Sequence, residues 1–229
     1  MKTEEMDFHD FTHVDAGHAC ELEVVCSDSY SVSVTAGDNI IKSVKVAKEG
    51  ETLKIWRSLS FLRGLIPGTF SVKVTMPGLT ALDLSGASKG TVSGFTSKSS
   101  FSADLKGASS LTIMDMSAGD IRFNLSGASK ATGQIKGTDA GFNLSGASRV
   151  ELEGSAGNTV IDASGASHVN LAGFHVDGAN VKLSGASHST VNIDGQLDAD
   201  LSGASKLHWL GKPVMGDMKT SGASTISSK

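Results

Sequence analysis

The chain has 229 residues, a formal net charge of −4 and a sequence pI of about 5.9, so its overall charge gives no reason to expect binding to nucleic acid or an anionic membrane. Aromatic residues make up only 5% and glycine reaches 27 residues, which favours a core of small and aliphatic side chains in thin, stacked layers. No stretch approaches the roughly 18 consecutive apolar residues of a transmembrane segment, and the acidic start shows no signal peptide.

The first part of the chain, residues 1–79, alternates apolar and polar side chains and is predicted to form β-strands. The segments are "CELEVVC", "YSVSVTAG", "IKSVKVAKEG", "ETLKIW" and "FSVKVTMPGL", separated by turn residues. If "CELEVVC" is one extended strand, Cys20 and Cys26 lie too far apart to bond, so we expect free thiols. Their spacing is also a poor zinc signature, and we expect no metal site.

The stretch "WRSLSFLRGLIPG", residues 56–68, interrupts this alternation because it is apolar and has only two charged residues. We interpret it as part of a cap that folds over the end of the repeats described next. The alternative is an exposed loop that contacts a partner or a membrane surface.

The rest of the chain, residues 80–229, contains eight copies of a short phrase whose core is usually "SGAS". Successive motif glycines are separated by 21, 20, 19, 19, 20, 18 and 19 residues, a period typical of a solenoid. These structural glycines are Gly86, Gly107, Gly127, Gly146, Gly165, Gly185, Gly203 and Gly222.

Each repeat is predicted to contain two strands, one before and one after the motif. Apolar residues recur at every second position on both sides of the glycine, for example at Ile121, Phe123 and Leu125. No segment has the 3.6-residue apolar period of a helix, which excludes a leucine-rich repeat. We therefore predict an all-β chain that forms a single-stranded parallel β-helix, or β-solenoid. Residues 1–79 would cap and start it, and residues 80–229 would form eight coils of one continuous domain.

The motif itself is interpreted as the corner between the two strands of a coil. Glycine would provide a positive φ or relieve crowding, alanine would point into a narrow part of the coil, and serine would form a hydrogen-bonded ladder or bond the backbone of the corner. Serine nucleophiles are not expected, because eight identical candidates have no recurring base.

Two polar columns flank the corners if the coils stack in register. Three residues after each glycine come Lys89, Ser110, Lys130, Arg149, His168, His188, Lys206 and Thr225, and three residues before come Asp83, Asp104, Asn124, Asn143, Asp162, Lys182, Asp200 and Lys219. The first set is a candidate surface for an anionic glycan or another envelope polymer, with Lys89, Lys130, Arg149, His168, His188 and Lys206 as candidate ligand-binding residues. The alternative is that these outward positions are polar for solubility and that the Asp/Asn column compensates the repulsion within the basic one.

An enzyme is the less favoured class, although some β-helices cleave acidic polysaccharides. Such chemistry needs clustered carboxylates and a base, whereas here the Asp residues are spread one per coil. A metal site at His168 and His188 would lack a third ligand.

We expect no catalytic residues and no cofactor. The chain would act as a binding module or as a purely structural, self-assembling scaffold. No cap is evident after "TISSK", so weak self-association through that end is also expected.

The order of the segments resembles the putative auto-transporter adhesin head domain, or head GIN domain, over essentially the whole chain. The resemblance lies in "VDAGHACELEVV", "YSVSVTAGDN", "GETLKIW", "SVKVTMPGLTALDLSGAS" and the successive "SGAS" coils. It implies a β-helical, bacterial protein of the cell envelope or exterior. The family usually has a signal peptide, so a cytoplasmic location stays open for this chain.

Overall fold

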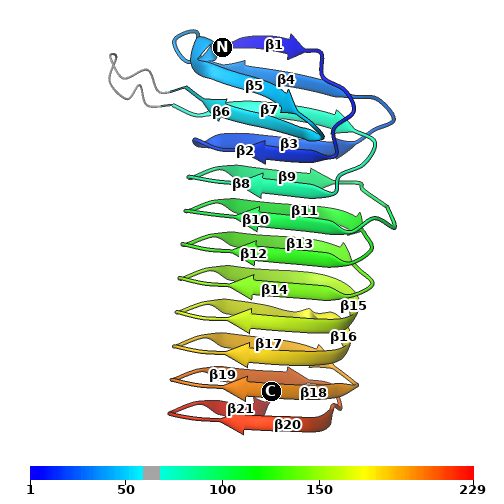
Figure 1. Cartoon of the computed structure of the whole chain (residues 1–229), viewed down its shortest axis with the longest axis vertical. Coiled ribbons are helices and arrows are strands. Elements are labelled where there is room, and N and C mark those ends of the chain that lie inside the picture. Colours follow the sequence, from blue (N-terminus) through cyan, green and yellow to red (C-terminus); the bar gives the residue numbers. More distant parts are fainter. Residues whose placement is uncertain (59–67) are drawn as a thin grey trace.

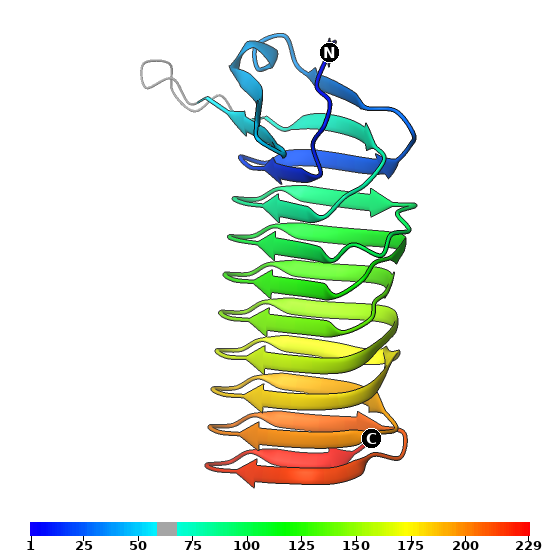
Figure 2. The same ribbon diagram turned by 45° about the vertical axis from the view of Figure 1, so that its right-hand side comes forward.

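The structure is a computed structural model that describes residues 1–58 and 68–229, and it is a parallel β-solenoid. Flat coils stack along one axis with their tight corners aligned on one edge (Figures 1 and 2). A single 3₁₀ turn, Ile41–Ser43, is the one helical element in the described part of the chain. The predicted fold class is therefore confirmed.

Each coil contributes one strand to each of two sheets that face one another. We call the strands before the corners the leading sheet. Along the axis they run β5 (Val44–Glu49), β6 (Thr52–Arg57), β2 (His13–Ala16), β8 (Ala81–Leu84), β10 (Phe101–Leu105), β12 (Ile121–Leu125), β14 (Ala140–Leu144), the second halves of β15 (Arg149–Ala163) and β16 (His168–Leu183), β18 (Gln196–Leu201) and β20 (Val214–Thr220).

The strands after the corners form the trailing sheet. They run β1 (Lys2–Met6), β4 (Ser31–Ala36), β7 (Phe70–Met76), β3 (Cys20–Cys26), β9 (Lys89–Ser93), β11 (Ser110–Ser117), β13 (Lys130–Lys136), the first halves of β15 and β16, β17 (His188–Ile193), β19 (Lys206–Leu210) and β21 (Thr225–Ser228). All neighbours are parallel except β1–β4, β4–β7 and β5–β6.

The core fills the space between the two sheets with the alternate apolar side chains that the sequence pattern predicts. Phe101, Phe123, Phe142 and Phe174 lie fully buried along the axis, with successive ring centroids 6.3, 5.6 and 6.2 Å apart. Because every coil buries the top and bottom of its neighbours, the stack as a whole is stable although one coil alone would not be.

The first coils do not stack in chain order. The coil made of β2 and β3 lies between β6 and β7 on one side and β8 and β9 on the other. After β7 the chain passes the β2–β3 coil to start β8, and on the way the Thr80 amide and hydroxyl both donate to the Thr12 carbonyl. The antiparallel strands β1, β4 and β5 lie beyond this coil at the end of the stack (Figure 1).

None of the described helices is long or apolar enough to cross a bilayer.

Candidate functional site

The motif glycines are needed at the corners for two separate reasons. All eight have a φ between +71° and +78°, a region that favours glycine. In seven of them the stacked backbone also leaves no space: a Cβ added at Gly146 would lie 2.5 Å from the carbonyl oxygen of Gly127. The corners approach this closely because the alanine N–H of one corner donates to the glycine carbonyl of the corner before it in the stack, at 2.7 Å for Ala147 and Gly127.

The motif serines bond the backbone of their own corner rather than one another. Ser129 is buried and donates to the Ser126 carbonyl at 2.7 Å, and the same bond to the first residue of the motif recurs from corner to corner. Of the two roles expected for serine, the second is therefore the one observed. The expectation for alanine is wrong: the alanines, such as Ala128 and Ala147, are exposed, because the serine and not the alanine turns inward at the corner.

The predicted basic column is in register along the trailing sheet. Each residue pairs with its counterpart in the next coil, in the order Lys89, Ser110, Lys130, Arg149, His168, His188, Lys206 and Thr225. Lys89 is separated from the others by Ser110. Lys130 to Lys206 therefore form five consecutive rungs of basic side chains, spaced by about 4.8 Å. We call these five residues the basic column.

The basic column has no acidic partner within the described residues. No side chain of Lys130, Arg149 or Lys206 takes part in an ion pair there. The His168 and His188 rings are stacked, with centroids 6.1 Å apart and planes inclined by 25°. Partial burial lowers the pKa of His168, and the neighbouring Arg149 and His188 lower it further, whereas Glu151 opposes them.

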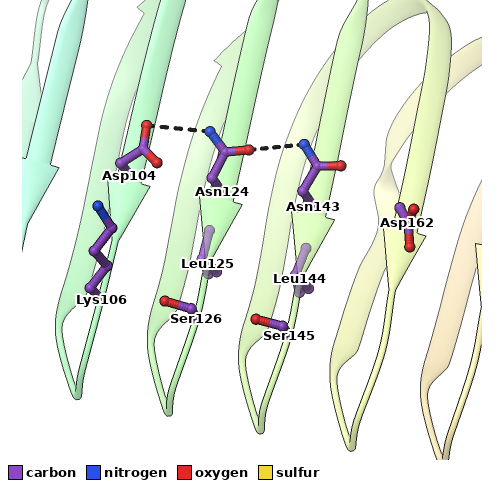
Figure 3. Close-up of a pocket in the computed structure, with 9 residues that line it drawn as sticks. All are labelled: Asp104, Lys106, Asn124, Leu125, Ser126, Asn143, Leu144, Ser145 and Asp162. Atoms are coloured by element: carbon purple, nitrogen blue, oxygen red, sulfur yellow. Dashed lines mark hydrogen bonds between the residues drawn. The ribbon is translucent and has the colours of Figure 1, made fainter.

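The Asp/Asn column lies on the opposite sheet, the leading one, and also stacks in register. Asp104, Asn124, Asn143 and Asp162 occupy successive rungs. The Asn124 amide donates to Asp104 at 3.3 Å and the Asn143 amide donates to the Asn124 oxygen at 2.9 Å, so these polar groups partly satisfy one another (Figure 3). Beside them is a shallow groove of about 300 Å³. The Asp/Asn column does not neutralise the basic column by direct ion pairs, because the core separates the two sheets.

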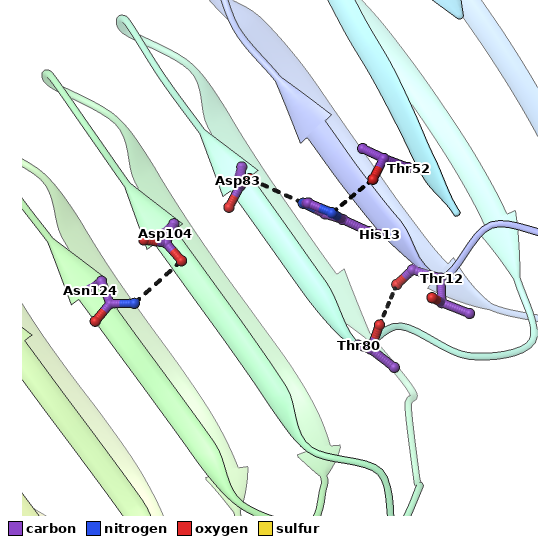
Figure 4. Close-up of polar contacts among 7 residues, drawn as sticks. All are labelled: Thr12, His13, Thr52, Thr80, Asp83, Asp104 and Asn124. Atoms are coloured by element: carbon purple, nitrogen blue, oxygen red, sulfur yellow. Dashed lines mark hydrogen bonds and ion pairs between the residues drawn. The ribbon is translucent and has the colours of Figure 1, made fainter. Parts of the chain in front are cut away.

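Sequence reasoning missed a polar cluster at the junction of the first coils. His13 on β2 bonds Asp83 on β8 at 3.1 Å through Nε2 and Thr52 on β6 at 3.0 Å through Nδ1, so it links three coils (Figure 4). The hydrogen bond to Asp83 raises the pKa of His13 despite the opposing effect of burial, and burial together with Asp83 raises the pKa of Asp15. The alternation "HVDA" places His13 and Asp15 on the outward face, but their partners depend on the non-sequential stacking.

A ninth corner, also missed, joins β2 to β3. Because it comes first in the chain, we call it the first corner. Ala16 pairs with Leu84 and Glu21 with Lys89, so residues 17–20 occupy the place of the motif residues 85–88. His18 takes the place of the glycine with a φ of +62°, and Ala19 follows at +61°. The signal in the sequence is Asp15, three residues before His18, as Asp83 is three residues before Gly86.

The remaining predictions concern cysteines, metal and the two ends. Cys20 and Cys26 are free thiols, as expected, and burial raises the pKa of Cys20 to about 12. The described residues contain no group of three His, Cys, Asp or Glu side chains placed to hold a metal ion.

Most of the apolar segment 56–68 lies outside the described residues. At the last coil Val214 and Met215 are 67% and 45% exposed, and self-association there stays a prediction.

The chain is similar in fold to solved structures of Parabacteroides proteins. A putative lipid binding protein from Parabacteroides distasonis aligns over 100% of this chain and 96% of its own, with a TM-score of 0.89 and 18% identity. A putative adhesin from Parabacteroides merdae aligns over 100% and 95%, with a TM-score of 0.88 and 15% identity. At these identities the similarity establishes the fold alone. No curated protein matches the chain.

The sequence model of one family matches residues 10–213, which include the first corner, the His13 cluster and the whole basic column. The order of strands and corners on which the resemblance rested is thus present in the matched region. This chain belongs to the family described as putative auto-transporter adhesin, head GIN domain.

Proposed function

We propose that the protein is a non-catalytic, adhesin-like binding module of the cell envelope or exterior, and that its basic column holds a linear anionic glycan. The observation that carries the proposal is the run of five basic side chains on consecutive rungs without an ion-pair partner among the described residues. Stacked like charges repel one another, and an anionic ligand along the column would relieve that repulsion.

The rows beside the column suit a sugar polymer better than a bare polyanion. Two residues further along the same strands, the outward side chains include Thr132, Asn170 and Thr190, which offer hydroxyl and amide groups to sugar hydroxyls. Glu151 is the one acidic side chain in this row between β13 and β17. The family name and the name of the Parabacteroides merdae relative, a putative adhesin, agree with binding at a surface.

An enzyme is not favoured by the same geometry. From β8 to the second half of β15 each rung of the leading sheet has at most one carboxylate, and Asp104 and Asp162 are separated by two asparagines; β18 has two, Asp198 and Asp200. General acid–base cleavage of a glycan needs an acid and a base positioned around one bond. The neighbours of Asp200 on the adjacent rungs are Lys182 and Lys219, so this pair of carboxylates is flanked by cations rather than by a neutral base.

The proposal is tested with polygalacturonate, using its fully methyl-esterified form as an uncharged control of the same backbone. The protein is expected to bind the acid form only, with an affinity that falls as salt is added. The triple variant Lys130→Ser, Arg149→Ser, Lys206→Ser is expected to bind roughly tenfold more weakly or worse, since three exposed charge contacts are lost.

The matched control removes three exposed lysines outside the column, by Lys45→Ser, Lys136→Ser and Lys212→Ser, with the same change in net charge. It is expected to bind like the unmodified protein. Equal losses in both triple variants, or equal binding of the esterified polymer, would overturn the proposal. Binding of phosphatidylglycerol vesicles in place of the polymer would indicate a lipid ligand instead and would also overturn it.

A further inference from the structure

The two histidines divide the basic column into parts of different chemistry. Lys130 and Arg149 lie on one side of the pair and Lys206 on the other, and these three side chains are cationic at any physiological pH. Imidazole has an ordinary pKa near 6.5 and changes charge between pH 5 and 8. The number of consecutive cationic rungs therefore depends on pH.

We infer that His168 and His188 form a pH-responsive gap in the basic column, which binds a linear polyuronate. When both histidines are neutral, Lys130 and Arg149 are separated from Lys206. When both are protonated, the column has five consecutive cationic rungs. The inference rests on the proposed function, since it concerns the same surface. A polyuronate carries one carboxylate on every sugar and therefore gains most from an unbroken row of cations, one per rung.

The surroundings of His168 make its protonation less favourable than that of a free imidazole. On β15 it faces Arg149 and, one row over, Glu151. On β17 it faces His188, with uncharged Thr190 in the next row, and its own strand offers uncharged Asn170. Its lowered pKa follows from burial, Arg149 and His188, in that order, with Glu151 opposing. A carboxylate laid across these rungs would offset the repulsion, so binding and proton uptake favour one another.

The orientation of His188 leaves one ring nitrogen for the ligand. Its Nδ1 lies 3.1 Å from the Ala186 carbonyl, which can only accept, so Nδ1 carries the hydrogen and Nε2 takes the additional proton. On β19 it faces Lys206 and, one row over, His208, whose Nδ1 lies 3.0 Å from the Ser227 hydroxyl. The neighbours of His188 on these rungs are therefore basic side chains, and no described acidic side chain forms an ion pair with it.

The test compares binding of polygalacturonate at pH 7.5 and pH 5.5 at constant ionic strength, where the uronate carboxylates stay ionised. The unmodified protein is expected to bind about 2- to 30-fold more tightly at pH 5.5, the range for two added exposed ion pairs. The double variant His168→Asn, His188→Asn is expected to lose this increase and to keep the affinity measured at pH 7.5. Calorimetry in two buffers of different ionisation enthalpy is expected to detect proton uptake on binding only in the unmodified protein.

The matched control, His9→Asn with His175→Asn, removes two histidines outside the column and is expected to keep the full pH dependence. Unchanged or weaker binding at pH 5.5, or an increase that persists in the His168/His188 variant, would overturn the inference. The Lys130/Arg149/Lys206 variant separates the two ideas. If this variant binds like the unmodified protein, the proposed function fails. If it binds more weakly but the affinity of the unmodified protein does not change with pH, only the histidine gap is rejected. Thermal unfolding of each variant checks that it is folded.

Discussion

The corner at residues 17–20 and the eight repeat corners lie at the same place in the coil but turn with different residues and different backbone angles. In the repeats a glycine occupies the position of positive φ, whereas His18 occupies it in the first corner at +62°. Ala19 also has a positive φ, +61°, whereas no repeat alanine does, so His18 and Ala19 form a turn that differs from the repeat turn. In the repeats, a Cβ added to the glycine would lie 2.5 or 2.6 Å from the carbonyl oxygen of a neighbouring corner. The exception is Gly86, which stacks on the first corner. A Cβ added there would have the His18 nitrogen as its nearest atom, at 3.4 Å. Close stacking thus adds to the positive φ as a reason for the repeated glycine.

The largest expected effect is at a corner enclosed by two other repeat corners. Gly146→Ala would place a Cβ 2.5 Å from the Gly127 carbonyl oxygen in addition to adopting a positive φ. We expect a loss of about 3–5 kcal/mol in the free energy of unfolding, measured with urea. A loss below about 2 kcal/mol would mean that neighbouring corners can separate, and close stacking would not explain the glycine.

The next effect concerns how the first coil is joined to the repeats. His13→Asn removes a bond to Asp83 and is expected to cost about 1–3 kcal/mol near pH 6. Because the folded-state pKa of His13 is raised, its stabilising contribution is fully present below about pH 6.5 and is lost as the pH rises through the folded-state value. Urea unfolding at pH 6 and pH 9 is therefore expected to show a smaller cost at pH 9, with exposed His9→Asn as the control. A cost that is the same at both pH values would contradict the bond to Asp83.

A smaller effect is expected at the glycine that stacks on the first corner. Gly86→Ala meets the same positive φ but no carbonyl oxygen, since the nearest atom is the His18 nitrogen at 3.4 Å. We expect a loss of about 1–2 kcal/mol, the cost of the left-handed conformation alone. The difference between Gly86→Ala and Gly146→Ala in one urea series measures the contribution of stacking directly, and equal costs would reject it.

The smallest effect has the opposite sign. His18→Gly relieves a positive φ in an exposed residue, and part of that gain is offset by the greater freedom of glycine in the unfolded chain. We expect a gain of about 0.5 kcal/mol, visible as a small rise in the thermal midpoint. Destabilisation by this substitution would show that the His18 side chain contributes contacts of its own.

The sequence predicts the repeats well because their period is regular and each coil contacts mainly its neighbours in the chain. The column from Lys130 to Lys206 follows directly from counting three residues after each glycine. The N-terminal arrangement could not be predicted in the same way, because the coil of β2 and β3 lies between β6 and β7 on one side and β8 and β9 on the other, all of which come later in the chain. For the same reason the contact of His13 with Asp83, 70 residues away, leaves no local pattern.

The non-sequential position of β2 and β3 has a consequence under mechanical load. Pulling on the C-terminal end of this chain would detach β21 and β20 first and then release one coil after another, because each coil is held only by the coil next to it. The coil of β2 and β3 cannot leave in that sequence, since β6 and β7 enclose it from the far side. A stretched molecule would therefore lengthen in small, regular steps and stop at an N-terminal block that yields as one unit.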